Sequence, residues 1–277
     1  MERNASKTCA YCGAYGPFSR EHVIPAFLYR QYPDQKFGYH PKAGRYLEWE
    51  AVVGDVCKAC NSGPLSNLDA YAKSFTEENR CHRSFRSRPT IHLVYDYQLL
   101  LRWLLKVTYN AMRVVDRDTE VLSKCIPYIL RSEPLPFSPE LLVEVIRDAP
   151  IPQWGKHLLP KSMQDVDFLS AHRFRVGEFR IRNAAGSDLS RYVALNAFYF
   201  YLVLFRSNTP SEEVRAFLGG IRRELPQATR FRPNRKSVDV KVSKRTIFEA
   251  YQDQALRELP AWLQYSAGRD NAKNRFV

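Results

Sequence analysis

The sequence of 277 residues contains no apolar run long enough to cross a bilayer and no recognisable nucleotide-binding motif. Its longest apolar stretch, from Tyr192 to Phe205, is interrupted by Asn196 and is shorter than the ~20 residues that a membrane span needs. Neither a Walker nor a Rossmann glycine pattern occurs, no segment repeats, and no Ser-His-Asp set is evident. These absences argue against a membrane protein, a P-loop or dinucleotide enzyme, and a serine hydrolase.

Cysteine is scarce, but its spacing is informative. Residues 1–7 lack the apolar core of a signal peptide, so we expect a cytoplasmic protein. Four of the six cysteines form two Cys-x-x-Cys pairs, Cys9 with Cys12 and Cys57 with Cys60. In a reducing compartment such pairs are metal ligands more often than disulfides. Four thiolates complete a closed tetrahedral site, so the spacing predicts a structural zinc ion that holds the fold and does no chemistry.

Positive charge is abundant. The chain has 42 Lys and Arg residues against 29 Asp and Glu residues, a formal net charge of +13. This excess favours a polyanionic partner such as nucleic acid, although a basic protein without such a partner remains an alternative. A hydrophobic content of 45% predicts a sizeable packed core, in one large domain or two unequal ones.

Residues suited to chemistry lie between and just after the cysteine pairs. Glu21 and His22 belong to the segment Arg-Glu-His-Val-Ile-Pro, and Asn61 directly follows the last cysteine. We expect a strand that begins at Glu21 and meets a proline, then a loop over 32–46 without regular structure, and a second strand over 47–53. A helix should start near the proline at position 64 and bury one apolar face, formed by Leu65, Leu68, Ala72 and Phe75.

This pattern resembles the HNH, or His-Me finger, endonucleases whose ββα core is clamped by four cysteines. The resemblance covers about the first quarter of the chain. It implies that His22 is the general base that activates water, and that Glu21 and Asn61 bind one Mg²⁺ or Mn²⁺ ion. One departure stands out: family members often carry an asparagine near the position of Val52, which cannot replace it. Candidates for a compensating or secondary role are Asp55, Asn67, Asp69 and His40.

The chemistry of phosphodiester hydrolysis explains why these residue types would be needed. A histidine, with an ordinary pKa near 6.5, can take a proton from water near neutral pH. A hard divalent cation prefers oxygen ligands, which a carboxylate and a carboxamide supply, and it neutralises charge on the phosphate and the leaving oxygen.

We therefore predict an α+β protein with three parts. Residues 1–79 form a zinc-bound ββα-metal (HNH) module, residues 80–93 a basic linker or arm, and residues 94–277 a larger α+β domain of unassigned fold that regulates the module or binds substrate or partner. The arginines expected to contact nucleic acid are Arg20, Arg80, Arg83, Arg86 and Arg88. Cys81 and Cys125 are unpaired by spacing and are interpreted as ordinary residues of the fold.

Within the larger domain, residues 94–115 predict a buried helix on which Lys106, Tyr109, Asn110 and Arg113 recur at helical spacing. We interpret this stripe as a solvated face, and a polar edge toward the nuclease module is the alternative. The other predicted elements are a helix over 119–130, strands within 172–181, a strand pair rather than a helix over 192–205, a helix over 212–225, an edge strand over 237–242, and a final helix over 246–263.

The sequence thus predicts a metal-dependent endonuclease that hydrolyses nucleic acid, most plausibly double-stranded DNA, without a membrane partner. The C-terminal domain would select the substrate or dock a protein partner. The alternative is a zinc-ribbon module that binds nucleic acid or protein without cleaving. Nucleases of this resemblance recur in restriction, in mobile elements and in antiviral defence against phage, which is an analogy about biological role only.

Overall fold

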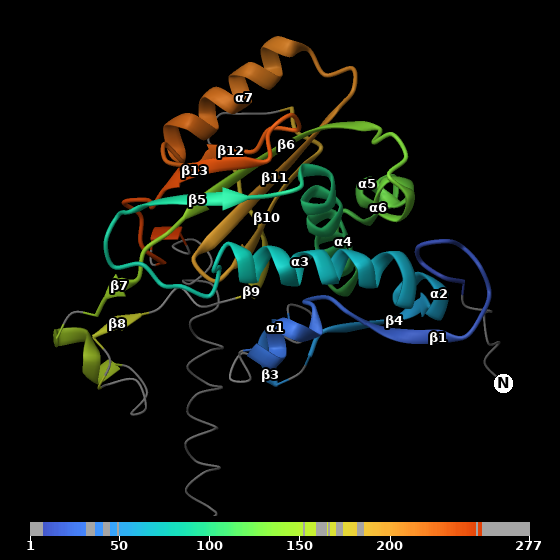
Figure 1. Ribbon diagram of the computed structural model, residues 1–277, viewed down its shortest axis with the longest axis horizontal. Coiled ribbons are helices and arrows are strands. Elements are labelled where there is room, and N and C mark those ends of the chain that lie inside the picture. The colour runs from blue at the N-terminus through green and yellow to red at the C-terminus, as the bar shows by residue number, and fades with distance from the viewer. Residues whose placement is uncertain are drawn as a thin grey trace, which may run out of the picture.

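The computed structural model describes residues 8–31, 37–40, 45–48, 50–151, 153–158, 165, 167–169, 174–181, 186–247 and 249–250, with the backbone alone at 37–40 and 45–48. The architecture is mixed α and β, as predicted (Figure 1). Most of the helix predicted for residues 246–263 lies outside the described residues.

The first part of the chain alternates short strands with helices. Its elements are β1 (Phe18–His22), α1 (Ala26–Gln31), β2 (Phe37–His40), β3 (Arg45–Glu48), β4 (Val52–Cys57), the short helix α2 (Lys58–Cys60), the π-helical turn η2 (Asn61–Leu65) and α3 (Ser66–Glu78). Strands β1 and β4 pair antiparallel, and β2 pairs with β3. The expected order was strand, loop, strand and helix; β1, β4 and α3 follow it, but α1, β2 and β3 occupy the place of the loop.

The remaining elements build a sheet with helices packed against it. They are β5 (Thr90–Val94), α4 (Tyr97–Val115), α5 (Thr119–Ser123), α6 (Ile126–Arg131), β6 (Phe137–Val145), β7 (Ala149–Pro150), the 3-10 helix η3 (Gln153–Leu158), β8 (Phe168–Leu169), β9 (Phe174–Glu178), β10 (Leu189–Leu195), β11 (Phe198–Arg206), α7 (Ser211–Glu224), β12 (Thr229–Arg230) and β13 (Ser237–Lys241). Two further antiparallel pairs are β5 with β13 and β7 with β8.

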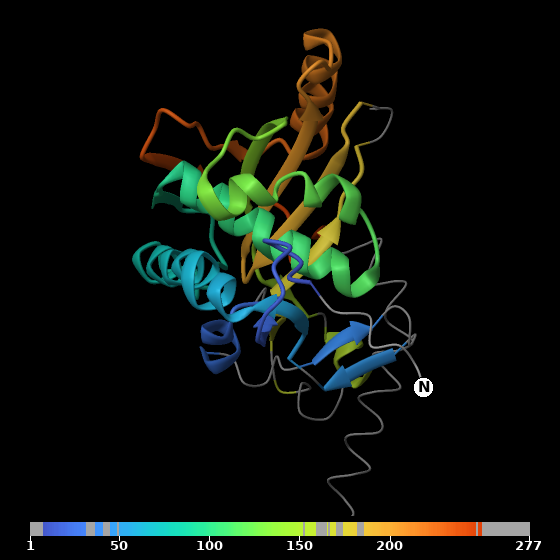
Figure 2. The same cartoon turned by 90° about the vertical axis from the view of Figure 1, so that its right-hand side faces the viewer.

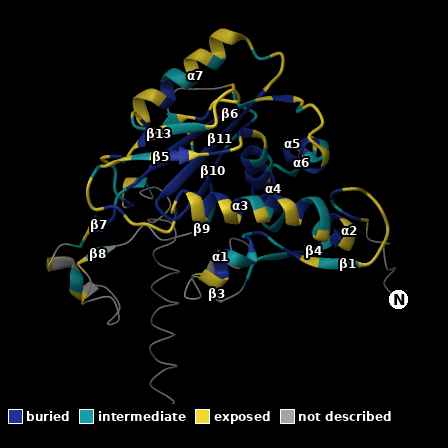
Figure 3. Ribbon diagram, viewed as in Figure 1, coloured by how far each residue is buried: buried dark blue, intermediate teal, exposed yellow. Residues whose placement is uncertain are grey.

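An antiparallel sheet of five strands, in the order β12-β6-β11-β10-β9, forms the core of the molecule. The long apolar stretch that we predicted as a strand pair is the β10–β11 hairpin, and Asn196 turns between its strands with a φ of 55°. Asparagine tolerates this left-handed conformation better than most residues, so the polar interruption of the apolar run is the turn. Figure 3 shows both strands as buried almost throughout.

Helix α4 is the buried helix predicted from its apolar sequence. It begins at Tyr97, after Asp96, whose carboxylate accepts a hydrogen bond from the Leu99 amide at 2.9 Å, and Val94 belongs to β5. The helix contacts β9 and β10 of the sheet as well as β4 and α3, and α3 crosses beside it in both views (Figure 1, Figure 2). In the described part of the chain, no helix is long and apolar enough to cross a membrane.

Buried side chains from the N-terminal elements and from the sheet form one continuous hydrophobic cluster. It includes Leu65 of η2 and Leu68 and Phe75 of α3, which belong to the predicted apolar face. Phe75 contacts Phe200 of β11 edge to face, with ring centroids 5.9 Å apart. Residues on both sides of the predicted 80–93 linker therefore share a core. Helix α7 packs against the far end of the sheet through Phe217 (Figure 1).

Three predictions of strands and loops near the cysteines are wrong. The first strand, expected to begin at Glu21, runs over Phe18–His22, and helix α1 follows the proline. The second strand runs over Val52–Cys57 and not over 47–53, because pairing with β1 sets Cys57 opposite Phe18 and Val52 opposite His22. The segment 32–46, which we expected to be a loop, contributes β2 and part of β3. Short strands with aromatic and charged residues carry little periodicity, so a hairpin of this length is hard to recognise.

Two helix boundaries also differ from those predicted. The expected helix over 119–130 is two helices, and Pro127 lies in the first turn of α6, where its missing amide proton costs nothing. The helical path after β4 begins at Lys58, before Pro64. It kinks at Gly63, which has φ of −104° and ψ of −108°, and continues as α3 from Ser66.

Candidate metal centre and active site

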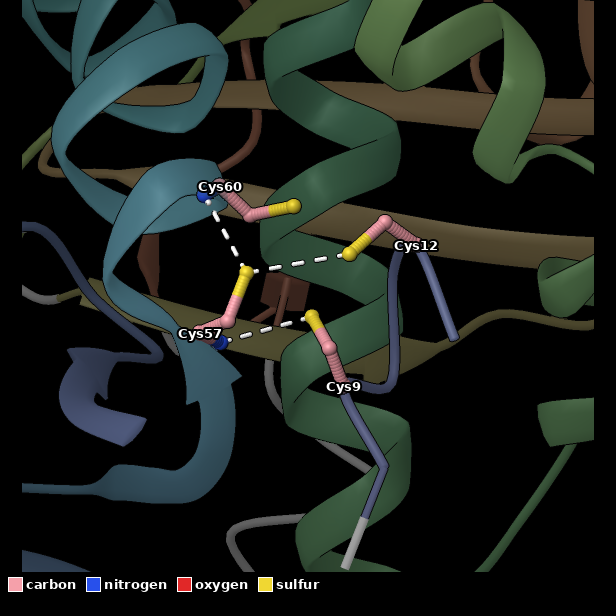
Figure 4. Close-up of side chains that lie close together, drawn as sticks. All are labelled: Cys9, Cys12, Cys57 and Cys60. Atoms are coloured by element: carbon pink, nitrogen blue, oxygen red, sulfur yellow. Dashed lines mark hydrogen bonds between the residues drawn. The ribbon is translucent and has the colours of Figure 1, made fainter. Parts of the chain in front are cut away.

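The four paired cysteines converge at one end of the β1–β4 strand pair. The Sγ atoms of Cys9, Cys12, Cys57 and Cys60 all lie within 4.8 Å of one another, and those of Cys12 and Cys57 are 3.7 Å apart (Figure 4). Zn–S bonds of about 2.3 Å in a tetrahedron place the sulfur atoms about 3.8 Å apart. The donor set and its spacing therefore fit one zinc ion with no open coordination position.

Local backbone geometry explains why the thiols converge. In the first knuckle, the Gly13 amide donates to the Cys9 carbonyl at 2.9 Å, and Gly13 adopts a φ of +72°, which favours glycine. In the second, β4 ends at Cys57, and the Cys60 amide donates to the Cys57 sulfur at 3.4 Å. The Cys57 amide in turn donates to the Cys9 sulfur at 3.3 Å, which links the two knuckles.

At Cys9 the backbone also favours the thiolate form that zinc requires. Burial opposes ionisation of Cys9, but amides of Cys57, Cys12 and Tyr11 donate to its sulfur, and together they lower the pKa of this thiol to about 6. Within the cluster, burial and the neighbouring thiols raise the pKa of Cys60. Outside the cluster, burial alone raises the pKa of Cys125 to about 12. Such a thiol stays protonated, as expected of an ordinary core residue.

The adjacent residues Glu21 and His22 point to opposite faces of the β1–β4 pair. Glu21 lies opposite Val53 and is buried, with an exposed fraction of 4%, whereas His22 lies opposite Val52 and its side chain is 28% exposed. Successive side chains of a strand alternate between faces, so a dipeptide cannot present both groups on the same side. The two residues that the resemblance assigns to catalysis therefore occupy separate environments.

On the inward face, Glu21 forms an ion pair with Lys106 of α4. The Lys106 ammonium is fully buried and lies 2.6 Å from Oε1 of Glu21 and 2.7 Å from both carboxylate oxygens of Asp69. Burial raises the pKa of the Glu21 carboxyl above its ordinary value, and the nearby ammonium of Lys106 opposes that shift. The described geometry thus brings two of the predicted acidic residues together around an internal cation.

The other polar residues of α4 also face the N-terminal elements. Asn110 donates to Glu21 at 3.3 Å and accepts from the hydroxyl of Tyr11 at 2.8 Å, while Arg113 forms an ion pair with Asp55. The hydroxyl of Tyr109 donates to the carbonyl of the residue after Cys9 at 3.2 Å. Our interpretation of this stripe as a solvated face is wrong, because a polar stripe on a buried helix requires polar partners, which β1, β4 and α3 supply.

On the outward face, His22 contacts an acidic residue that sequence reasoning missed. Its Nε2 lies 2.9 Å from Oε2 of Glu50, whose side chain is 31% exposed. The ring of Tyr29, from α1, lies beside the imidazole with centroids 6.2 Å apart. The sequence signal for Glu50 was its position two residues before Val52. Residues two apart on a strand point to the same face, so Glu50 lies on the face of Val52.

Asn61 ties the start of the helical segment to β1. Its amide nitrogen donates to Oγ of Ser19 at 2.9 Å and to the carbonyl of Arg20 at 3.1 Å. These bonds span the irregularity in strand pairing between Ser19 and Glu21. The carboxamide oxygen of Asn61 makes no hydrogen bond with any described residue, so it is the part of the side chain left for a ligand.

The other candidate residues are dispersed. Asn67 is exposed on α3, and the side chain of His40 lies outside the described residues. Among the arginines, Arg88 donates to the Val242 carbonyl at 3.3 Å, and the guanidinium of Arg86 lies 4.3 Å from the ring centroid of Phe168. The exposed arginines of the predicted set are Arg20, Arg80, Arg83 and Arg86.

The arrangement fits zinc but does not supply the oxygen pair predicted for Mg²⁺ or Mn²⁺. Among the described side chains, the four cysteines are the one group of three or more His, Cys, Asp or Glu residues close enough to share a metal ion. Glu21 is buried and already bound to Lys106, whereas Asn61 bonds to the backbone of β1. Comparison with protein-family models, curated proteins and solved structures found no match for this chain.

Proposed function

We propose that this protein is an endonuclease of the HNH type that hydrolyses phosphodiester bonds of nucleic acid, with His22 as general base. The observation that carries the proposal is the position of His22. It is partly exposed on the first strand of a strand-strand-helix unit clamped by four thiols, and it is held by a carboxylate. The resemblance of the cysteine, Glu-His and Cys-Asn segments supports the same assignment.

The proposed chemistry needs a base with access to water and a carboxylate that keeps the imidazole in place. His22 meets both conditions, since its side chain is 28% exposed and its Nε2 is bound to Glu50. In the proposed reaction His22 takes the proton of the attacking water. The zinc ion holds the ends of β1 and β4, and it has no free position with which to bind substrate.

The proposal of a second metal ion, in addition to zinc, is based on the family resemblance and not on the geometry. Nucleases that resemble this chain use a divalent cation to stabilise charge on the phosphate. In this chain the oxygen of Asn61 remains available as a ligand, while the carboxylate of Glu21 is bound to Lys106. We therefore propose a requirement for Mg²⁺ or Mn²⁺ without assigning Glu21 as its ligand.

The proposed substrate is double-stranded DNA, and the proposed place of action is the cytoplasm, where thiols stay reduced. A net charge of +13 and the exposed arginines near α3 favour contacts with phosphates. The domain that carries the sheet would select the substrate or dock a protein partner. A role in antiviral defence is proposed by analogy alone.

The decisive experiment compares the wild type with His22→Ala on supercoiled plasmid, linear duplex, single-stranded DNA and RNA, each with Mg²⁺, Mn²⁺ or EDTA. Loss of a general base lowers the rate about 10²–10⁴-fold. His92→Ala is the matched control, because His92 also forms a histidine-carboxylate pair, with Asp239 at 2.8 Å, but in the β5–β13 hairpin. We expect it to cleave like the wild type.

Zinc content and thermal unfolding are measured for each variant, so that loss of activity is separated from loss of structure. If His22→Ala retains zinc and cleaves as fast as wild type, the proposed role of His22 is wrong. If the wild type binds DNA but cleaves none of the four substrates with either cation, the alternative of a zinc-ribbon binding module takes precedence.

A further inference from the structure

Glu50 and His22 are neighbours because of the register of the β1–β4 pair. His22 lies directly opposite Val52, and Glu50 precedes Val52 by two residues. Diagonal neighbours on one face of an antiparallel pair lie within reach of long side chains. The Val23 amide donates to the Ala51 carbonyl at 2.8 Å, so the ladder continues beyond the end of β4 and fixes the backbone beside Glu50.

This contact determines which imidazole nitrogen carries the proton in the neutral ring. An ionised carboxylate only accepts hydrogen bonds, so Nε2 of His22 must donate to Oε2 of Glu50 across their 2.9 Å separation. The second nitrogen, Nδ1, is then unprotonated and available to accept a proton from water. Both side chains are about one-third exposed, so water reaches this pair, whereas Tyr29 beside the ring is buried.

We propose that Glu50 is a positioning residue that holds Nε2–H of His22 and thereby makes Nδ1 the atom that receives the proton. The inference rests on the proposed function and adds to it the identity of the basic atom. It also explains how His22 can have a polar partner although position 52 is a valine and not the asparagine that family members often carry. The position directly opposite His22 is apolar, and the polar partner comes from the diagonal position instead.

The test uses Glu50→Ala, which removes the acceptor, and Glu50→Gln, which keeps an acceptor oxygen at the same length. Long-range ¹H–¹⁵N spectra of the imidazoles report which nitrogen of His22 is protonated. We expect the Nε2–H tautomer in the wild type and in Glu50→Gln, and a mixture of tautomers in Glu50→Ala. Asp239→Ala is the matched control, since it removes the acceptor of His92 and leaves His22 unchanged.

Kinetics give the second readout. Loss of a partner that orients a functional histidine lowers activity about 10–100-fold. We expect Glu50→Ala to lower kcat by this factor without a change in KM, because Glu50 contacts the base and not the substrate, and Glu50→Gln to recover most of the rate. If the role of Glu50 were purely structural, we would not expect glutamine to restore kcat while KM stays unchanged.

The outcomes separate this inference from the proposed function. An unchanged tautomer of His22 in Glu50→Ala overturns the positioning role, as does a kcat equal to that of the wild type when His22→Ala is inactive. If His22→Ala is as active as the wild type, the proposed function fails. The spectra of Glu50→Ala then still decide whether Glu50 sets the tautomer.

Discussion

Adjacent residues of β1 lie in opposite environments, and the contrast separates a buried carboxylate from a partly exposed histidine. Glu21 faces inward, where a fully buried lysine and a second carboxylate surround it. His22 faces outward, where it and Glu50 are both partly exposed. Both faces pair a basic side chain with a carboxylate, but only the outward pair is partly exposed to water.

The difference shows why burial matters more than residue type. A carboxylate bound to an ammonium in the interior is costly to disturb, since removing either partner leaves an uncompensated buried charge. A pair that is about one-third exposed contributes little to stability and is free to exchange protons. The inward face should therefore respond to mutation by losing stability, and the outward face by losing activity.

Removal of zinc should disturb both faces at once and have the largest effect. The knuckles hold β1 and β4 together, and apparent binding free energies of about 10–16 kcal/mol for such sites match or exceed the total stability of many domains. We expect Cys60→Ser to lose zinc and to unfold without a cooperative transition, as measured by metal analysis and circular dichroism. Cys125→Ala, a buried cysteine outside the cluster, should keep its zinc. A zinc-free Cys60→Ser protein that unfolds like the wild type would contradict this.

Substitution of the internal cation should break the inward face alone. Lys106→Met leaves the buried carboxylate of Glu21 without its partner, which is expected to lower the free energy of unfolding by about 3–5 kcal/mol. The measurement is chemical denaturation at neutral pH. Lys73→Met is the control, because Lys73 is 58% exposed and lies 3.9 Å from Glu77. This substitution should change stability by less than about 1 kcal/mol.

A double variant sharpens that comparison. In Lys106→Met with Glu21→Gln, the charge that lost its partner is also removed, so part of the lost stability should return. If the double variant is as unstable as Lys106→Met, the cost arises from packing of the lysine side chain and not from the unpaired carboxylate. The contrast between the two faces of β1 would then be one of packing.

Local patterns in the sequence sufficed for the four-cysteine cluster, for α4 and for the β10–β11 hairpin. Two Cys-x-x-Cys pairs need only short-range geometry to be recognised, and a strongly apolar segment identifies buried elements directly. The environment of Glu21 was not predictable in this way, because Lys106 lies 85 positions further along the chain. The stripe of Lys106, Asn110 and Arg113 indicated a polar face, and its contact with the N-terminal elements was the alternative that we ranked second.

Strand register was the second feature that the sequence did not reveal. The pairing of β1 with β4 shifts between Ser19 and Glu21, where β4 accommodates an extra residue near Gly54. This shift determines that Val52 lies opposite His22 and that Glu50 reaches the imidazole. Register depends on which pairing buries the better face, so it follows from tertiary packing and not from the local sequence.

The smallest expected effect is a dependence of stability on pH that originates at Glu21. The folded-state pKa of this carboxyl is raised above its ordinary value of 4.5, mainly by burial. As pH rises above 4.5, the unfolded chain loses this proton before the folded protein does, so the folded state binds more protons in that interval. Stability contributed by Glu21 therefore falls as pH rises from 4.5 through the raised pKa, by about 1.4 kcal/mol for each pKa unit of difference.

Glu21→Gln isolates this contribution, because glutamine cannot ionise. The difference in unfolding free energy, wild type minus variant, should decrease as pH rises above 4.5 and become constant once the folded carboxyl is ionised. Glu77→Gln, on the exposed face of α3, should show no such trend. If the difference for Glu21→Gln instead increases with pH, the attraction of Lys106 outweighs burial, and the inward face is held together by a charge pair that is favourable in its own right.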